Sequence, residues 1–204
     1  MKHIVMCGSN HEKINGLPRQ MQTIGGERVI DRTIRLLREN GVNDISITAT
    51  DPLFKTCNAE FIEYDSSGDW VNAFYTEGDD PVCYIFGDVV FSDKAIRTIV
   101  NTDTDKVEFF GSAPPFAKNY IKYWAEPFAF KVKDKPYFRD CIERVRQGKK
   151  DGLFWREPIA WELWQVIKRT PINNINYNNY TVINDYTCDI DEPKDVDVFR
   201  KILG

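Results

Sequence analysis

The sequence predicts an α/β protein with a single domain, built on a mostly parallel, twisted sheet with helices on both faces. Continuous apolar runs at residues 4–7 and 82–86 are typical of strands buried on both faces. An amphipathic helical segment at residues 29–39 follows the first of them. The next strand, at residues 45–50, starts a few residues after that helix stops. We therefore predict a right-handed crossover between parallel strands.

The first half of the chain alternates strand and helix. The stripe of Ile30, Ile34 and Leu37 predicts the first helix, which stops at Asn40-Gly41. Ser92 is expected to cap the N-terminus of a later helix. Further segments expected in this half are strands at 60–64 and 82–86 and a short helix at 70–75.

The second half is less regular. A helix is expected to begin near Pro193, because proline suits the first turn of a helix. Asp191, just ahead of that proline, is expected to cap its exposed amides. The other expected elements are strands near 106–111, 123–132 and 180–184, and helices near 136–147 and 157–168.

Length and composition favour one soluble globular domain over residues 1–204, with 42% hydrophobic and 28% charged residues. The net charge of −4 gives no support for binding nucleic acid or an anionic membrane. No apolar run is long enough to span a bilayer. The cysteines are scattered and odd in number, which favours reduced thiols in a cytoplasm. They are Cys7, Cys57, Cys83, Cys141 and Cys188. The oligomeric state stays open, a homodimer included.

A long polar loop, GSNHEKINGLPRQ at residues 8–20, lies at the exit of the first strand. Ligands of open parallel sheets lie beyond the carboxyl ends of the strands. Gly8 and Gly16 permit close backbone approach, and loop amides can receive phosphate oxygens. Lys13 and Arg19 would supply positive charge. The loop is therefore a candidate phosphate site, with a merely solvated loop as the competing interpretation.

Acidic residues form a second candidate site. Asp88 directly follows the buried strand at 82–86 and is expected to face the same cleft as the loop. Carboxylates of this kind suit Mg²⁺, which usually takes one or two of them plus substrate phosphates. If residues 188–191 are extended, Asp189 and Asp191 point to one face and either could reach a metal held by Asp88. We assign Asp189 to the metal; a turn role for Asp88 is the competing interpretation.

The order and spacing of these pieces resemble the nucleotidyltransferases with a GT-A-like, Rossmann-related fold. This family activates sugar phosphates, phosphocholine, methylerythritol phosphate or the molybdopterin cofactor. Its usual opening is a strand, a loop of type A-A-G-x-G-x-R and a Pro-Lys pair, and the matching residues read MCGSNHEKINGLPRQM. The resemblance continues through GGERVIDRTIRLLRENGVNDI, YIFGDVVF and DIDEPKDVDVF and runs the whole length of the chain.

The resemblance implies an enzyme that transfers a nucleotidyl group from an NTP to a small phosphorylated acceptor and releases pyrophosphate. CTP or UTP is the favoured donor, a sugar phosphate or phosphocholine-like compound the acceptor, and Mg²⁺ the cofactor. Catalytic roles fall to Lys13, Arg19 and Asp88, and metal binding to Asp88 and Asp189. The nucleotide-binding residues are expected to be Cys7, Gly8, Ser9, Asn10, Ser66, Ser67, Gly68 and Gly87.

The loop departs from the family pattern, which motivates two alternatives. Asn10 replaces the second loop glycine, Glu12 replaces the loop arginine, and Arg19 replaces the lysine of the Pro-Lys pair. Because Glu12 would repel a triphosphate unless it turns outward, one alternative is a catalytically impaired nucleotide-binding homologue. The other is a GT-A glycosyltransferase, although Gly87-Asp88 lacks the Asp-x-Asp spacing common there.

Two further groups have open roles. Trp161 and Trp164, at helical spacing, fit ordinary core packing, with an acceptor-pocket wall as the alternative. A second phosphate contact is assigned to the lysines as a group, without a choice among them. These are Lys118, Lys122 and Lys131.

Overall fold

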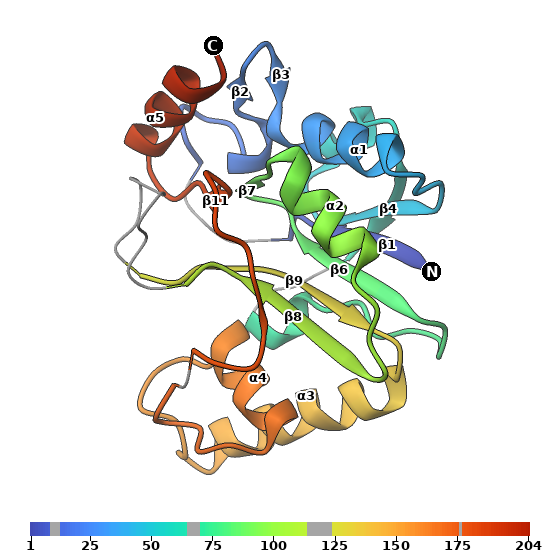
Figure 1. Cartoon of the computed structure of the whole chain (residues 1–204), viewed down its shortest axis with the longest axis vertical. Coiled ribbons are helices and arrows are strands. Elements are labelled where there is room, and N and C mark those ends of the chain that lie inside the picture. The colour runs from blue at the N-terminus through green and yellow to red at the C-terminus, as the bar shows by residue number, and fades with distance from the viewer. Residues whose placement is uncertain (9–12, 65–69, 114–123, 176) are drawn as a thin grey trace.

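A computed structural model describes residues 1–8, 13–64, 70–113, 124–175 and 177–204. A central sheet is flanked by helices (Figure 1). In chain order, the elements are β1 (Lys2–Met6), η1 (Arg19–Met21), β2 (Thr23–Ile24), β3 (Glu27–Arg28), α1 (Val29–Glu39), β4 (Ile45–Ala49), η2 (Pro52–Thr56), β5 (Glu60–Glu63), η3 (Trp70–Ala73), β6 (Val82–Phe86), β7 (Val89–Val90), α2 (Asp93–Asn101), β8 (Val107–Gly111), β9 (Pro127–Val132), α3 (Lys135–Lys150), α4 (Ala160–Lys168), β10 (Thr181–Val182), β11 (Cys188–Asp189) and α5 (Pro193–Leu203).

The main sheet has seven strands in the order β10-β8-β9-β6-β1-β4-β5. Strand β1 lies next to the central strand β6 and pairs in parallel with β4 on one side and β6 on the other. The pairs β4–β5 and β8–β10 are also parallel. Only β9 runs against its neighbours, pairing antiparallel with both β6 and β8. The prediction of a mostly parallel sheet is therefore confirmed.

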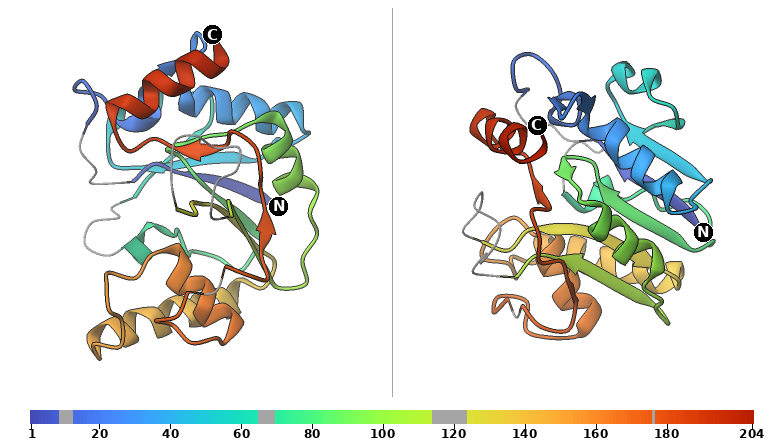
Figure 2. Two further views of the ribbon diagram at one scale, coloured as in Figure 1. Left: turned by 60° about the vertical axis from the view of Figure 1, so that its left-hand side comes forward. Right: turned by 45° about the horizontal axis from the view of Figure 1, so that its top comes forward.

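Helices cover both faces of the sheet, as predicted. Figures 1 and 2 show α1 and α2 on one face, with α3 and α4 on the other. Helix α5 lies beside the β2–β3 hairpin, at the same side of the molecule as α1. Because both faces are covered, β1 and β6 can be continuous apolar runs, and residues Val5 and Ile85 are fully buried.

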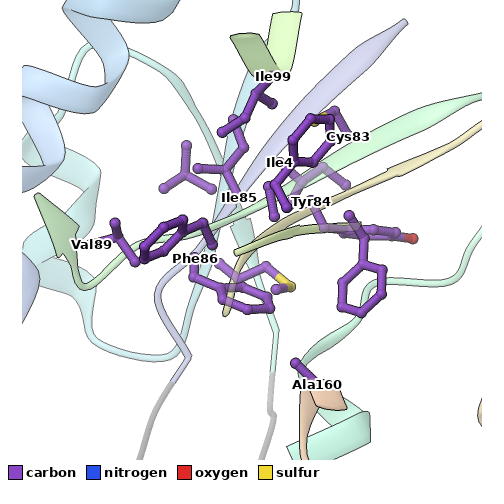
Figure 3. Packing of buried hydrophobic residues seen from close by; sticks show 14 of the residues in the cluster. Ile4, Cys83, Tyr84, Ile85, Phe86, Val89, Ile99 and Ala160 are labelled. Carbon is purple, nitrogen blue, oxygen red and sulfur yellow. The ribbon is translucent and has the colours of Figure 1, made fainter. Parts of the chain in front are cut away.

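The main hydrophobic core lies between the sheet and its helices. Figure 3 shows side chains of β6, among them Tyr84 and Ile85, between Ile99 of α2 on one side and Ala160 of α4 on the other. Trp161 and Trp164 of α4 are buried in the same core, at 3% and 0% exposure. Their predicted core role is thus confirmed.

A second, smaller hydrophobic cluster joins the two ends of the chain. It packs the segment after the first loop against β11 and α5. Its buried members are Ile14, Ile24, Val29, Val90, Cys188, Ile190, Val196 and Phe199. We call this the terminal cluster. It therefore packs the segment from Ile14 to Val29 and the closing segment of the chain against each other.

The predicted helix caps have different outcomes. Ser92 caps α2 as expected, since its hydroxyl oxygen accepts from the backbone N–H of Ala95 at 2.9 Å. The predicted Asp191 cap of α5 is wrong. Asp195, in the first turn, accepts instead from the backbone N–H groups of Asp191 and Glu192, both at 2.9 Å. Its carboxylate can reach back across the turn, which leaves the Asp191 side chain for another partner.

Lys131 is not available as a phosphate contact. Its ammonium group is buried in the sheet and donates to the backbone carbonyl oxygens of Ile99, Val100 and Thr102 at 3.2, 2.7 and 2.7 Å. These carbonyls end helix α2, where the helix dipole favours a cation. The structure therefore gives Lys131 a helix-capping role.

All five cysteines are free and buried, as expected for reduced thiols. No helix in the described part of the chain is long and apolar enough to cross a membrane.

Candidate functional site

Several candidate residues meet at the carboxyl edge of the parallel strands. Gly8 follows β1, Asp51 follows β4, and Asp88 follows β6. Glu126 lies at the same edge, because β9 runs antiparallel and its amino end adjoins the carboxyl ends of β6 and β8. This edge is where open parallel sheets bind their ligands.

Gly87 is required where β6 leaves the sheet. Its backbone N–H donates to the Met6 carbonyl oxygen at 2.9 Å, so the two chain segments run very close together. A Cβ atom at this position would lie 2.5 Å from the Cys7 Sγ atom and 2.6 Å from the Met6 carbonyl oxygen. Gly87 thus lets β1 and β6 end side by side, with Cys7 and Gly8 next to Asp88.

Cys7 is a packing residue at this edge. Burial, followed by the nearby Asp88 carboxylate, raises the pKa of the Cys7 thiol well above its usual value. The thiol is therefore protonated near neutral pH and is not a nucleophile.

The Asp88 and Asp189 segments, far apart in the sequence, lie side by side. Strands β7 and β11 pair antiparallel, with Val89 opposite Asp189. The backbone N–H of Ile190 donates to the carbonyl oxygen of Asp88 at 2.9 Å. Both aspartates are half-buried. The ladder therefore holds the two predicted metal residues on neighbouring stretches of backbone.

Three carboxylates gather beside this ladder. Glu126, Asp189 and Asp191 each offer one oxygen, and the three oxygens lie within 4.8 Å of one another. We call them the carboxylate group. Glu126 is buried, and its backbone N–H donates to the Ser112 Oγ at 2.9 Å. Carboxylate oxygens are the ligands that hard divalent cations prefer, so this donor set fits Mg²⁺.

Sequence reasoning identified one member of the carboxylate group and missed two. Asp189 was assigned to the metal, whereas Asp191 was assigned to a helix cap. The alternation that places Asp189 and Asp191 on one face already pointed to Asp191. Glu126 carried no signal, because its position depends on the reversed direction of β9. Asp88 lies outside this group of three.

Arg19 contacts the carboxylate group. Its Nη1 atom donates to Asp191 Oδ1 at 2.7 Å, and the arginine side chain is 11% exposed. The Nε atom is buried and has no hydrogen-bond partner among the described residues. Arg19 begins η1, and Gln22 holds the preceding loop through a 2.8 Å bond to the Ile14 carbonyl oxygen. The predicted phosphate-binding arginine thus faces the predicted metal segment.

Lys13 pairs with a different carboxylate from the one that Arg19 binds, that of Asp51. Its Nζ atom is 3.1 Å from Asp51 Oδ2, and its side chain is 56% exposed. Asp51 also accepts from the backbone N–H of Leu53 at 2.9 Å, and this bond, followed by that of Lys13, lowers the pKa of the Asp51 carboxyl. An exposed pair of this kind is weak, so an anionic ligand can displace it at little cost.

Several predicted site residues lie outside the described residues. They are Ser9, Asn10, Glu12, Ser66, Ser67, Gly68, Lys118 and Lys122.

Comparisons with known proteins place the fold. No protein-family model matches the chain, and no curated protein gives a significant sequence match. Solved structures do match. One is assigned as a glucose-1-phosphate thymidylyltransferase from Bacillus anthracis, in complex with sucrose. It has a TM-score of 0.65 and 14% identity and covers 100% of this chain and 95% of its own.

Two others match over similar lengths. The 4-diphosphocytidyl-2C-methyl-D-erythritol synthase from Anaerococcus prevotii has a TM-score of 0.61 and 12% identity, covering 99% of this chain and 95% of its own. HddC from Yersinia pseudotuberculosis, complexed with GMP-PN, has a TM-score of 0.57 and 13% identity, covering 100% of this chain and 99% of its own. The chain therefore has the fold that the resemblance predicted, that of the GT-A-like nucleotidyltransferases.

Proposed function

We propose that this protein is a Mg²⁺-dependent nucleotidyltransferase. It transfers a nucleotidyl group from an NTP, with CTP or UTP favoured, to a small phosphorylated acceptor and releases pyrophosphate. The observation that carries the proposal is the carboxylate group at the carboxyl edge of the sheet, with the Arg19 guanidinium in contact with it. Acidic ligands for a cation and basic ligands for phosphate are what this chemistry needs at one place.

Asp189 and Asp191 would hold the cation, with Glu126 offering the third oxygen of the carboxylate group and Asp88 on the neighbouring strand end. When bound, Mg²⁺ supplies positive charge that neutralises the phosphates and orients donor and acceptor.

The remaining work falls to the loop and its cations. The Gly8 backbone, next to the close-packed ends of β1 and β6, can approach a phosphate without a side chain in the way. The planar guanidinium of Arg19 can hold two phosphate oxygens at once. Lys13 adds a second, exchangeable charge. No general base is needed, because a phosphate acceptor is already ionised.

The direct test is pyrophosphate release. The protein is incubated with each NTP, Mg²⁺ and a panel of sugar phosphates and phosphocholine, and the Asp189→Asn variant is run in parallel. Asp197→Asn serves as the control, because Asp197 is exposed on α5 and pairs with Arg200. We expect the wild-type protein to release pyrophosphate with at least one pairing. Asp189→Asn should lose this activity, and the control Asp197→Asn should keep it.

Two results would count against the proposal. If no pairing gives pyrophosphate release and no nucleotide raises the Tm, the protein does not act on a nucleotide. Tight, Mg²⁺-independent nucleotide binding without product would favour the impaired homologue suggested by Asn10 and Glu12.

A further inference from the structure

The candidate cation site and the Arg19 contact share one acidic side chain, that of Asp191. The three oxygens offered by the carboxylate group lie within 4.8 Å of one another. Arg19 contributes one positive charge through its bond to Asp191. A cation bound by all three carboxylates would therefore meet the guanidinium at Asp191.

Among the described residues, the guanidinium of Arg19 has one nitrogen that is bound and one that is not. Its Nη1 atom is bound to Asp191, while its buried Nε atom has no partner in the described part of the chain. A buried N–H group without a partner costs free energy, so the side chain has an unmet need for an acceptor. A phosphate oxygen is such an acceptor, and arginine binds phosphate through two parallel bonds.

The elements on either side of the pair are packed together. Ile14 and Ile24 flank Arg19 in the chain, and Ile190 precedes Asp191; all three belong to the terminal cluster. The two backbones are therefore held in one unit, and an exchange of partners needs only side-chain motion. Such motion is fast compared with domain movement.

We propose that Asp191 is a shared ligand that exchanges Arg19 for the divalent cation, so that loading of the cation frees Arg19 for the phosphates. This inference rests on the proposed function and adds to it an order: the cation-free site restrains its own phosphate-binding arginine. Arg19 is then a positioning residue for the metal ligand as well as a phosphate ligand.

The exchange is tested by binding, without turnover. Mn²⁺ affinity is measured by calorimetry in the absence of phosphate for the wild-type protein and for Arg19→Gln. Arg200→Gln is the matched control, because it removes the same charge from an arginine that pairs with Asp197 on exposed α5. We expect Arg19→Gln to bind Mn²⁺ at least about fivefold more tightly and the control to stay within about twofold.

The reciprocal measurement uses inorganic pyrophosphate without divalent cation. Asp191→Asn releases Arg19 and is expected to tighten pyrophosphate binding by about fivefold or more. This gain should disappear in the Arg19→Gln background, because a double-mutant cycle isolates the pair from general charge effects. Asp197→Asn is the charge-matched control, and circular dichroism confirms that every variant folds.

The proposal is overturned if Arg19→Gln leaves Mn²⁺ affinity unchanged or weakens it, or if the pyrophosphate gain persists without Arg19. It also falls if the wild-type protein binds no Mn²⁺. Its failure is separable from that of the proposed function. Release of pyrophosphate from NTP by a protein with no exchange leaves the transferase intact, whereas exchange without any such release leaves only the coupled ion site.

Discussion

The backbone N–H of Ile190 donates to the carbonyl oxygen of Asp88 at 2.9 Å. This bond extends the short β7–β11 ladder and ties the closing segment of the chain to the end of the central strand β6. It places Asp88 and Asp189 on adjacent strand ends at the edge where the phosphate loop also emerges. Rigid elements of this kind hold ligand side chains more accurately than free loops do.

Replacement of Asp88 or Asp189 by asparagine is expected to reduce catalysis without unfolding the protein. Each change keeps the size of the side chain but removes a negative charge that would hold the cation. We expect the rate of pyrophosphate release to fall on the order of 100-fold for each variant. Mg²⁺-induced thermal stabilisation should shrink in parallel. Asp93→Asn, an exposed α2 residue paired with Arg97, is the control and should keep both properties.

Gly87→Ala is expected to destabilise the fold. The added Cβ would meet Cys7 Sγ at 2.5 Å and the Met6 carbonyl oxygen at 2.6 Å, and backbone cannot move away as a flexible side chain can. Forcing a methyl group into such a space costs about 1–3 kcal/mol, measured as the free energy of unfolding in urea. Adding Cys7→Ala should recover part of this loss, because it removes one of the two clashes. A Gly87→Ala protein as stable as the wild type would contradict the packing described here.

The strands and helices that the sequence predicted best are those with a local cause. The strand at 82–86 was predicted at its observed bounds, since burial on both faces demands a continuous apolar run. Helix α1 likewise follows its apolar stripe to Glu39. Other boundaries shifted: the helix expected from 157 begins at Ala160, and the strand expected near 180–184 is limited to Thr181–Val182.

The β2–β3 hairpin was missed although its signal was present. Gly25 and Gly26 have φ angles of +59° and +81°, the left-handed conformation that a two-residue hairpin turn requires. The expected helical segment starts only at residue 29, so the pair is assigned to no element in the sequence analysis. The flanking strands are only two residues each, so no alternation of apolar and polar residues could reveal them.

Part of the candidate site could be predicted from the sequence, and the rest depends on contacts between segments that lie far apart in the chain. Asp189 and Arg19 were found because they stand in motif order. The contact between Arg19 and Asp191 requires the terminal cluster, which brings together segments from opposite ends of the chain. The helix-capping role of Lys131 could not be predicted for the same reason. No local pattern in the sequence shows that the end of α2 lies next to this lysine of β9.

Lys131→Met tests the helix-capping role. Methionine keeps an apolar stem of similar length but cannot donate to the carbonyl oxygens of Ile99, Val100 and Thr102. Leaving such buried acceptors unsatisfied is expected to cost about 2–3 kcal/mol in the free energy of unfolding. Lys133→Met, whose exposed partner Asp103 lies 3.9 Å away, should change it by less than about 0.5 kcal/mol. Equal effects of the two substitutions would contradict the assignment.

His3 is expected to make stability fall in mild acid. Burial, aided by nearby Lys131, lowers the pKa of His3 to about 4, while the Met1 carbonyl oxygen, 3.2 Å from Nδ1, only partly opposes the shift. The folded protein therefore holds His3 neutral, and the unfolded chain takes up the proton below about pH 6.5. Stability from this residue is present above pH 6.5 and is lost progressively as the pH falls toward 4.

The matched variant for this effect is His3→Asn, which has a side-chain N–H for the Met1 carbonyl but no group that titrates. Between pH 7 and pH 5 the wild-type protein should lose about 2 kcal/mol more unfolding free energy than the variant, from urea titrations at each pH. Carboxylates contribute equally to both proteins over this interval, so the difference isolates the imidazole. Parallel pH profiles for the two proteins would show that folding does not lower the pKa of His3, contrary to the effect of its burial beside Lys131.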